Sequence, residues 1–391
     1  MMSFRQLLQR ELNALWHEPW QLALISYIPL IGIFSLWWLF NAGLPRELPV
    51  AIVDQDKSQL SRMLVRQLQA NAVISPIHYQ DVGSAKASME KAETYAVVVL
   101  PFQLNRDLLT GHQPIIDIRY NAQYLLVGKL LSSQIQLSLA DGLKHKALIK
   151  QLASGVPMAQ AKVNINPVQT QISALYNANS NYIVFLLPPV LLALGQLLAM
   201  LVFANSLNRE LRLNTLQEWF SLGTRRVLFA KILVYTPLIV LQGRLILTLL
   251  YQYLGLPLAG QFGQLLLAQV VMLLAVWLLV LTIFFLLQDS ARVISFCTAL
   301  FAPAFPFMGI TFPTQEMPLL AQWWRLLMPS SHYIDTHVGV VSYGQSFSAF
   351  TQQIVSYWGF LFLIPIIVFL ARKVKRDTQV VLSKTQCSEV N

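Results

Sequence analysis

The chain has 391 residues, of which 55% are hydrophobic and 12% are charged, and its mean hydropathy is +0.53. Soluble domains carry about 25% charged residues, so this composition excludes an ordinary soluble protein and indicates a polytopic membrane protein. The net charge of +10 would suit a nucleic-acid partner, but the basic residues do not form patches with interleaved aromatics, which predicts no nucleic-acid binding. The two cysteines, Cys297 and Cys387, lie in an apolar run and in the tail, and they predict no disulfide framework.

The N-terminal segment, residues 1–19, has the spacing of an amphipathic helix. Its apolar residues fall on one helical face and are Phe4, Leu7, Leu8, Leu12 and Leu15. We expect this helix to lie on the cytoplasmic membrane surface.

Six apolar runs are long enough to cross about 30 Å of hydrocarbon at about 1.5 Å per residue. They cover residues 20–41, 181–205, 231–254, 262–287, 292–312 and 353–371. The first run is preceded by about twenty residues and is too long for the apolar part of a cleaved signal peptide, so we expect it to be retained.

The predicted fold class is a polytopic α-helical membrane protein with six transmembrane helices and an α/β domain inserted between the first two. The predicted regions are an interfacial helix (1–19), a first span (20–42), an extracytoplasmic domain (43–178), a membrane core with the other five spans (179–372) and a cytoplasmic tail (373–391). Within the core we expect a cytoplasmic loop at 206–230 and an outer re-entrant segment at 313–335.

The distribution of Lys and Arg in the short loops predicts the orientation, because cytoplasmic loops carry an excess of both. With both termini in the cytoplasm, thirteen basic residues lie inside and one, Arg325, lies outside. The thirteen are Arg5, Arg10, Arg209, Arg212, Arg225, Arg226, Lys231, Arg292, Arg372, Lys373, Lys375, Arg376 and Lys384.

The inserted domain has the composition of a soluble protein and alternates between strand and helix patterns, which indicates a small α/β fold. Strands are predicted at 49–56, 72–79, 95–101 and 114–121, and helices at 58–71, 82–93, 102–111 and 124–153. The last of these helices is long enough to project as a stalk or hairpin arm.

Sequence patterns for catalysis are absent. The chain has no G-x-x-x-x-G-K-[ST] phosphate loop, G-x-S-x-G, H-E-x-x-H or C-x-x-C, so we expect no enzyme activity, no metal and no cofactor bound by this chain. Two sequence features resemble metal ligands but favour simpler interpretations. His332, Asp335 and His337 are interpreted as a surface or interfacial cap, and Asp54 with Asp56 as a turn that caps the following helix.

Two features of the spans are candidates for a substrate path. Arg244 lies within the third span, where an arginine costs about 2.5–3.5 kcal/mol on insertion scales; it is either a polar point on that path or a packing or subunit-contact residue. Pro303 and Pro306 are expected to bend the fifth span. The segment that follows is too short and polar to cross twice, so we expect a half-inserted helical hairpin with Trp323 and Trp324 at the interface.

The stretch "NRELRLNTLQEWFSLGTRRVLFAKIL" (208–233) has more charges than topology requires. Orientation and lipid contact account for Arg225, Arg226 and Lys231. They do not account for Arg209 and Glu210, or for Trp219, which is taken as exposed.

Three patterns in order resemble the permease subunits of ABC-2 type exporters, in the multidrug branch with a large domain after the first span. At the start of the second span the matching residues are Tyr176, Asn177, Tyr182 and Pro188, with Ala178 and Pro189 in place of the usual Pro and Gly. After that span the matching residues are Arg209, Glu210, Thr215 and Leu216, with Asn214, Gln217 and Gly223 as departures. In the outer re-entrant segment they are Gly309, Phe312, Pro313, Met317, Pro318, Pro329 and His332.

The resemblance implies an export permease in the inner membrane of a bacterium, with ATP and Mg²⁺ held by a separate ABC ATPase subunit. It implies a second permease chain, identical or paralogous, and in diderm bacteria a periplasmic adaptor with an outer-membrane duct. The residues it assigns to ATPase coupling are Arg209, Glu210, Thr215, Leu216, Glu218 and Trp219. Tyr176 and Asn177 join Arg244, Pro303 and Pro306 as the predicted substrate path, for amphipathic, drug-like, lipid-like or peptide cargo.

Three other functions stay open. A secondary transporter would need paired or acidic ionisable groups within the spans, and often inverted repeats. A membrane anchor that presents the inserted domain as a receptor would leave the charged inner loop unexplained. An integral-membrane enzyme lacks a nucleophile or metal constellation in this sequence.

Overall fold

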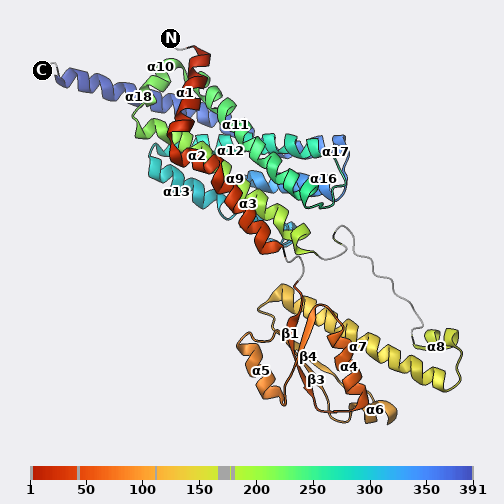
Figure 1. The fold of residues 1–391 in the computed structure, drawn as a ribbon. Helices are drawn as coiled ribbons and strands as arrows, with labels where there is room; N and C mark the ends of the chain where they lie inside the picture. The colour runs from red at the N-terminus through yellow and green to blue at the C-terminus, as the bar shows by residue number, and fades with distance from the viewer. Residues whose placement is uncertain (1–2, 42–44, 111, 166–176, 178–180, 390–391) are drawn as a thin grey trace. The chain divides into compact units, whose positions relative to one another are not determined.

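The computed structural model describes residues 3–41, 45–110, 112–165, 177 and 181–389 (Figure 1). The chain forms two compact units. The membrane unit combines Met1–Asn41 with Leu175–Asn391, and the α/β unit is Ala42–Ala174.

The membrane unit is entirely helical in the part of the chain that the structure describes. Its α-helices are α1 (Phe4–His17), α2 (Pro19–Ile25), α3 (Tyr27–Phe40), α9 (Tyr182–Arg212), α10 (Leu216–Leu222), α11 (Thr224–Thr248), α12 (Phe262–Leu287), α13 (Ser290–Phe301), α14 (Ala304–Phe307), α15 (Leu319–Leu327), α16 (Pro329–Val341), α17 (Phe347–Val355) and α18 (Leu363–Glu389). Three further turns are the π-helix η1 (Leu249–Tyr253) and the 3₁₀-helices η2 (Thr314–Glu316) and η3 (Ser356–Phe362).

Six helical segments are long and apolar enough to cross a membrane, which confirms the six predicted spans. They are Pro19–Phe40, Ile183–Arg212, Thr224–Tyr253, Phe262–Leu287, Ser290–Phe307 and Phe347–Gln379. The fifth span is interrupted between α13 and α14, where Pro303 precedes the first residue of α14. This agrees with the bend predicted from the prolines of this span. The segment predicted to be re-entrant contains two helices, α15 and the start of α16, that pack against each other.

The core of the membrane unit is built around α12, which packs against α9, α11, α16 and α18. Trp277 of α12 stacks on Phe203 of α9 with ring centroids 4.1 Å apart, and its indole N–H donates to the Thr236 hydroxyl of α11 at 3.0 Å. These contacts pair an indole N–H with an acceptor inside the apolar core, so no donor of that ring is left unpaired.

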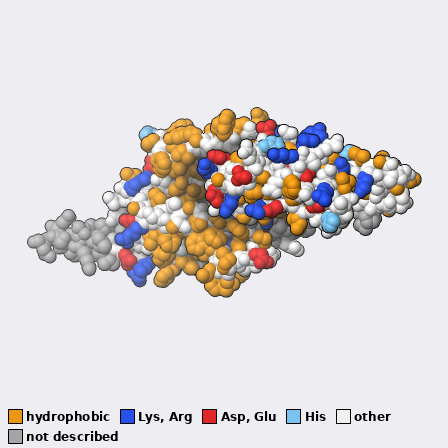
Figure 2. All heavy atoms as spheres, turned by 90° about the horizontal axis from the view of Figure 1, so that it is seen from below, with side chains coloured by type: hydrophobic (Ala, Val, Ile, Leu, Met, Phe, Trp, Pro, Cys, Tyr) orange, Lys and Arg blue, Asp and Glu red, His pale blue; other side chains and the backbone are white. Residues whose placement is uncertain are grey.

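The outside of the membrane unit is apolar, as Figure 2 shows, where hydrophobic side chains cover most of its visible surface and charged side chains gather on the α/β unit. Large apolar side chains of α3 are more than half exposed, among them Phe34, Trp38 and Leu39. Exposed side chains of this kind suit contact with lipid rather than water.

The α/β unit contains a four-stranded sheet in the order β2-β1-β3-β4. Its strands are β1 (Leu48–Asp54), β2 (Ile74–His78), β3 (Ala96–Leu100) and β4 (Asp117–Tyr120), and its helices are α4 (Gln59–Gln69), α5 (Val82–Glu90), α6 (Leu104–Thr110), α7 (Leu125–Ala153) and α8 (Met158–Ile165). Strand β1 is parallel to β2 and β3, whereas β4 is antiparallel to β3.

Two hydrophobic cores cover the two faces of this sheet. Residues of α4 and α7 pack on one face, and α5 packs on the other. The four central residues of β1, from Val50 to Val53, are all buried, which explains why the sequence of β1 is a continuous apolar run.

The four strands and the helices predicted between them are therefore confirmed. The expectation that α7 projects as a stalk is corrected, because its first half packs on the sheet through Leu131, Ile135 and Leu139. Asp54 accepts hydrogen bonds from the Asp56 and Lys57 amides, which confirms the turn predicted at the end of β1, but the residue that caps α4 is Ser58.

Candidate functional site: a buried ion-pair cluster

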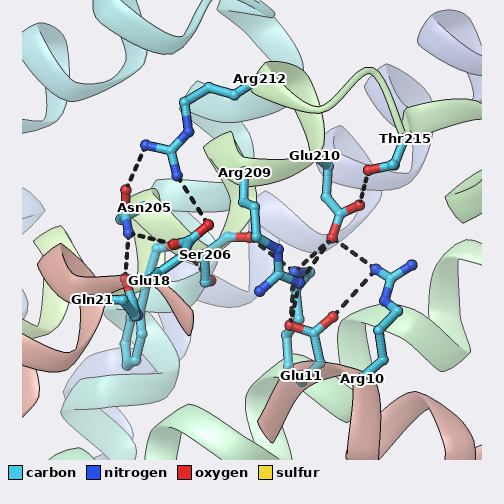
Figure 3. Close-up of polar contacts among 12 residues, drawn as sticks. Arg10, Glu11, Glu18, Gln21, Asn205, Ser206, Arg209, Glu210, Arg212 and Thr215 are labelled. Atoms are coloured by element: carbon cyan, nitrogen blue, oxygen red, sulfur yellow. Dashed lines mark hydrogen bonds and ion pairs between the residues drawn. The ribbon is translucent and has the colours of Figure 1, made fainter. Parts of the chain in front are cut away.

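Five charged residues from three helices meet toward the end of the membrane unit where α1 begins (Figure 1), and Figure 3 labels four of them, Arg10, Glu11, Arg209 and Glu210. This ion-pair cluster consists of Arg10 and Glu11 of α1, Arg209 and Glu210 of α9, and Lys231 of α11. Glu11 is 2.8 Å from Arg209 and 3.1 Å from Lys231, and Glu210 is 2.8 Å from Arg10 and 3.0 Å from Lys231. Each carboxylate therefore pairs with cations from the two other helices, so the cluster joins all three helices.

The first helix brings Glu11 to the cluster because of its spacing and its cap. Ser3 and Gln6 form a reciprocal capping box, which fixes the start of α1. Leu7, Glu11 and Leu15 are four residues apart and share one face, and all three are buried. The sequence predicted this helix but centred its apolar face differently, since Leu12 is 44% exposed.

The end of α9 and the loop after it hold Glu210 in place. The Thr215 hydroxyl donates to Glu210 at 2.5 Å, and the Thr215 amide donates to the Glu210 carbonyl at 3.0 Å. Lys231 donates to the Ser206 carbonyl at 2.8 Å in addition to its two carboxylates. Each of these ionised groups therefore has several partners, as buried charges require.

The cluster is deeply buried, which decides its energetics. Lys231 is 0% exposed, and Glu11 and Glu210 are each 1% exposed. Burial by itself raises the pKa of the Glu11 carboxyl, but Lys231 and Arg209 together outweigh burial and hold that pKa below its ordinary value. Removing one partner of a buried ion pair costs about 3–5 kcal/mol, because the remaining charge stays buried without compensation.

A second polar set adjoins the cluster and joins α9 to the start of α2. Arg212 of α9 lies 3.3 Å from Glu18, at the junction of α1 and α2, and donates to Asn205 at 3.1 Å. Asn205 in turn donates to Gln21 of α2 at 2.5 Å, and Gln21 donates to the Val202 carbonyl. Pro19 begins α2 and ends the run of α1, so this second set secures the bend between the two helices.

Two sequence interpretations are corrected here. Lys231 was interpreted as part of a basic, lipid-contacting flank, but it lies at the centre of the cluster; only Arg225 and Arg226 are exposed as that interpretation requires. The sequence predicts an exposed Trp219, but this side chain is 0% exposed and packs against Phe284 and Phe285 of α12, with ring centroids 5.8 and 5.9 Å away. Its aromatic ring anchors α10 because burial outweighs the cost of ordering so short a helix.

The six predicted coupling residues are therefore split between the interior and the surface. Arg209, Glu210 and Trp219 are buried, Thr215 and Leu216 are half-buried, and Glu218 is exposed on α10. Their assignment to ATPase coupling stays a prediction, but direct contact with a partner suits only the exposed face of α10.

The predicted substrate-path residues do not converge on one place. Arg244 is exposed on α11 with no partner among the described residues, and Pro306 is exposed on α14. Pro303 lies at the break between α13 and α14, and Asn177 bonds to the backbone of Asn181. Tyr176 lies outside the described residues.

In and just after the segment predicted to be re-entrant, the interpretation of His332 and His337 as a surface cap is corrected, because these side chains are 7% and 4% exposed. His332 contacts the Ser356 hydroxyl and the Leu326 carbonyl, each at 3.0 Å, and His337 contacts the Tyr251 hydroxyl at 2.6 Å. Asp335 instead pairs with Arg325 at 2.6 Å. Among the described residues no group of His, Cys, Asp or Glu is placed to hold a metal.

The proline and methionine positions predicted in this segment flank its 3₁₀ turn. Pro313 and Pro318 are exposed on either side of η2, while Met317 is 9% exposed. The chain therefore turns at Pro313 and Pro318, and the buried Met317 side chain packs this turn against the rest of the membrane unit.

Arg10 and Glu11 are the site residues that the sequence interpretation missed. A usable signal exists, because Glu11 interrupts an otherwise apolar face between Leu7 and Leu15. A carboxylate in that position requires a buried cation elsewhere in the chain.

Comparison with known families agrees with this architecture. Residues 19–371 match the family described as ABC-2 family transporter protein; the match covers the first five membrane spans and the α/β unit, and it ends within the sixth span. No curated protein matches the chain in sequence. With its six apolar spans and a family match over nearly its whole length, the chain belongs to the ABC-2 family of transporter proteins and is a multi-pass membrane permease of that type.

Proposed function

We propose that this chain is the membrane subunit of an ATP-driven exporter in a bacterial inner membrane, with ATP and Mg²⁺ bound by a separate ABC ATPase subunit. The observation that carries the proposal is the ion-pair cluster, which joins the N-terminal helix to two membrane helices. Family membership supports the ATPase partner, and the absence of a phosphate loop in the sequence supports its being a separate chain.

In this proposal the ion-pair cluster is at the cytoplasmic end. The start of α1, the end of α18 and α10 all lie toward one end of the membrane unit (Figure 1), and most of its basic residues are near them. The α/β unit then lies outside the cytoplasm, where it is available to a periplasmic adaptor with an outer-membrane duct. A second permease chain, identical or paralogous, completes the path.

The force-receiving element in this proposal is α10. Its outer face carries Gln217, Glu218 and Ser221, all exposed, and its inner face carries Trp219 and Phe220, both buried. A push on the outer face reaches α12 through the stacked indole of Trp219. A push on α1 reaches α9 and α11 through the cluster, because separating those ion pairs costs more than moving the helices together.

The cargo in this proposal is amphipathic, because the spans are apolar and carry few polar groups. A secondary transporter is less well supported, since within the six spans the carboxylates are Glu210 and Asp377, both near helix ends. A receptor that only anchors the α/β unit would have no use for a buried cluster that couples three helices.

The test uses the full chain purified from its native host in mild detergent. We expect an ABC ATPase to co-purify, and Glu218→Arg on the exposed face of α10 to reduce both co-purification and export without changing the thermal unfolding midpoint. Glu93→Arg is the matched control, because it reverses an exposed charge in the α/β unit. Co-purification of no ATPase, or equal effects of the two variants, would overturn the proposal.

A further inference from the structure

A cavity of about 790 Å³ lies at the other end of the membrane unit from the ion-pair cluster. Its walls come from the first turns of α9, from η1 and the loop after it, and from α16. Residues that line it include Phe185, Pro188, Tyr251, Ile334, His337 and Val338. Binding pockets for small molecules have volumes of about 300–1,000 Å³, so one drug-sized molecule fits.

Most of the lining is apolar, and none of its described residues is charged; its polar residues are Asn177, Tyr251, His337, Ser342 and Tyr343, of which Tyr251 and His337 form a pair. No Asp, Glu, Lys or Arg is among the described residues that line the cavity. The Tyr251 hydroxyl and His337 Nε2 are 2.6 Å apart, and both side chains are largely buried. Among the described residues, the second ring nitrogen of His337 has no hydrogen-bond partner, so this ring can bind one further group.

The prolines of α9 add backbone acceptors to the same wall. Pro188 and Pro189 lie inside α9 and have no N–H, so the carbonyls of Val184 and Phe185 cannot receive their helical hydrogen bonds. Val184 and Phe185 both line the cavity. In a membrane such carbonyls are tolerated when another group satisfies them, and a bound molecule with an N–H or O–H is such a group.

Tyr251 lies in a π-helical turn, which gives a second sign of a specialised site. The π-helix η1 forms the last turn of the third span, between α11 and the loop, and it presents Tyr251 to His337 of α16. Turns of this type are rare and occur frequently at functional sites.

We propose that this outer cavity binds one uncharged amphipathic molecule that carries a hydroxyl or N–H group. That group lies against the Tyr251–His337 pair and the carbonyls that the α9 prolines leave free, and its apolar body packs on α9 and α16. The identity of this molecule as cargo rests on the proposed export function, whereas its binding does not.

The experiment uses 4-(hydroxymethyl)benzophenone, an uncharged photoreactive probe with one hydroxyl. The full chain in lipid nanodiscs is irradiated with the probe, and labelled peptides are mapped by mass spectrometry. We expect labels in the first turns of α9, in the segment from η1 to Ala259, and in α16. Labels spread evenly over lipid-facing helices such as α3 would overturn the proposal.

Two variants test the cavity itself. Val338→Trp fills it and should abolish the labelling, while Val355→Trp, at a position 63% exposed and outside the cavity, should leave it unchanged. Tyr251→Phe removes one hydroxyl and should weaken probe binding about five-fold, the value of one hydrogen bond of about 1 kcal/mol. Val341→Phe tests the same wall if Val338→Trp does not fold.

The two proposals fail separately. An ATPase that co-purifies with a chain whose cavity takes up no probe overturns the cavity and leaves the export function intact. Cavity labelling in a chain that binds no ATPase overturns the export function and leaves the binding site intact.

Discussion

The two ends of α9 and α11 differ in how they are held. At one end, Arg209 and Lys231 lie in a buried ion-pair cluster, where both cations pair with carboxylates. At the other end, Pro188 of α9 and Tyr251 of η1 line a cavity. Arg209 follows Pro188 by 21 residues, or about 30 Å at 1.5 Å per residue, which is the thickness of the hydrocarbon core.

This difference suggests how one pair of helices can serve two tasks. Charge pairs in a low-dielectric interior resist separation, so the cluster end moves as one body. Prolines and a π-helical turn weaken the helical hydrogen-bond ladder, so the cavity end can change shape at lower cost. Displacement applied at the first end would therefore be expressed at the second.

The largest expected effect is at the cluster, with Glu11→Gln. It removes one of two carboxylates that balance three cations, and should destabilise the fold by about 3–5 kcal/mol. The measurement is thermal unfolding in detergent, with Glu218→Gln as a control that should change little because this side chain is exposed. A second change, Lys231→Met, should recover part of the loss, because it removes the cation that Glu11 pairs with. Additive losses would show that the two groups do not interact.

Trp219→Ala tests whether α10 is fixed to the same rigid end. The indole is fully buried against Phe284 and Phe285, so the substitution should cost about 3 kcal/mol or more. Hydrogen exchange should show loss of protection in α10 while α16 stays protected. Equal loss of protection in both helices would mean that Trp219 does not act on α10 alone.

Pro188→Ala tests the cavity end of α9. Unlike the two previous substitutions, it should change probe binding and not stability. The new amide can donate to the Val184 carbonyl and remove one free acceptor from the cavity wall. We expect no loss of thermal stability, and a fall in benzophenone labelling of about five-fold, the value of one hydrogen bond. Undiminished labelling would exclude the Val184 carbonyl from the site.

The smallest effect is a pH dependence at the cluster. The folded-state pKa of Glu11 is lowered below its ordinary value of 4.5, so its contribution to stability is complete above that value. The contribution is lost as the pH falls through the lowered pKa, because the protonated carboxyl no longer compensates Lys231 and Arg209. Hydrogen exchange of α1, corrected for intrinsic rates, should increase there, while α17, which has no acidic residue, serves as the control. Loss of protection in both helices at the same pH would contradict the assignment.

The sequence was sufficient for the spans and the α/β unit because both depend on local pattern. Apolar runs identified all six spans, and the alternation of apolar strands with amphipathic helices identified the sheet between the first two. The site was only half predictable. Arg209 and Glu210 were identified by their resemblance to a family pattern, whereas Arg10 and Glu11 were not, because their partners lie about 200 positions away.

The sequence by itself determined membrane insertion and the order of elements, since both follow from the hydropathy and periodicity of contiguous residues. Only the tertiary structure decided that Lys231 is a buried partner of Glu11 rather than a lipid-facing charge, and that Trp219 points inward. It also decided that Tyr251 and His337, which are 86 residues apart, meet beside a cavity. The physical reason is that the burial of a polar group, and the identity of its partner, depend on which helices pack together, and no local pattern encodes that packing.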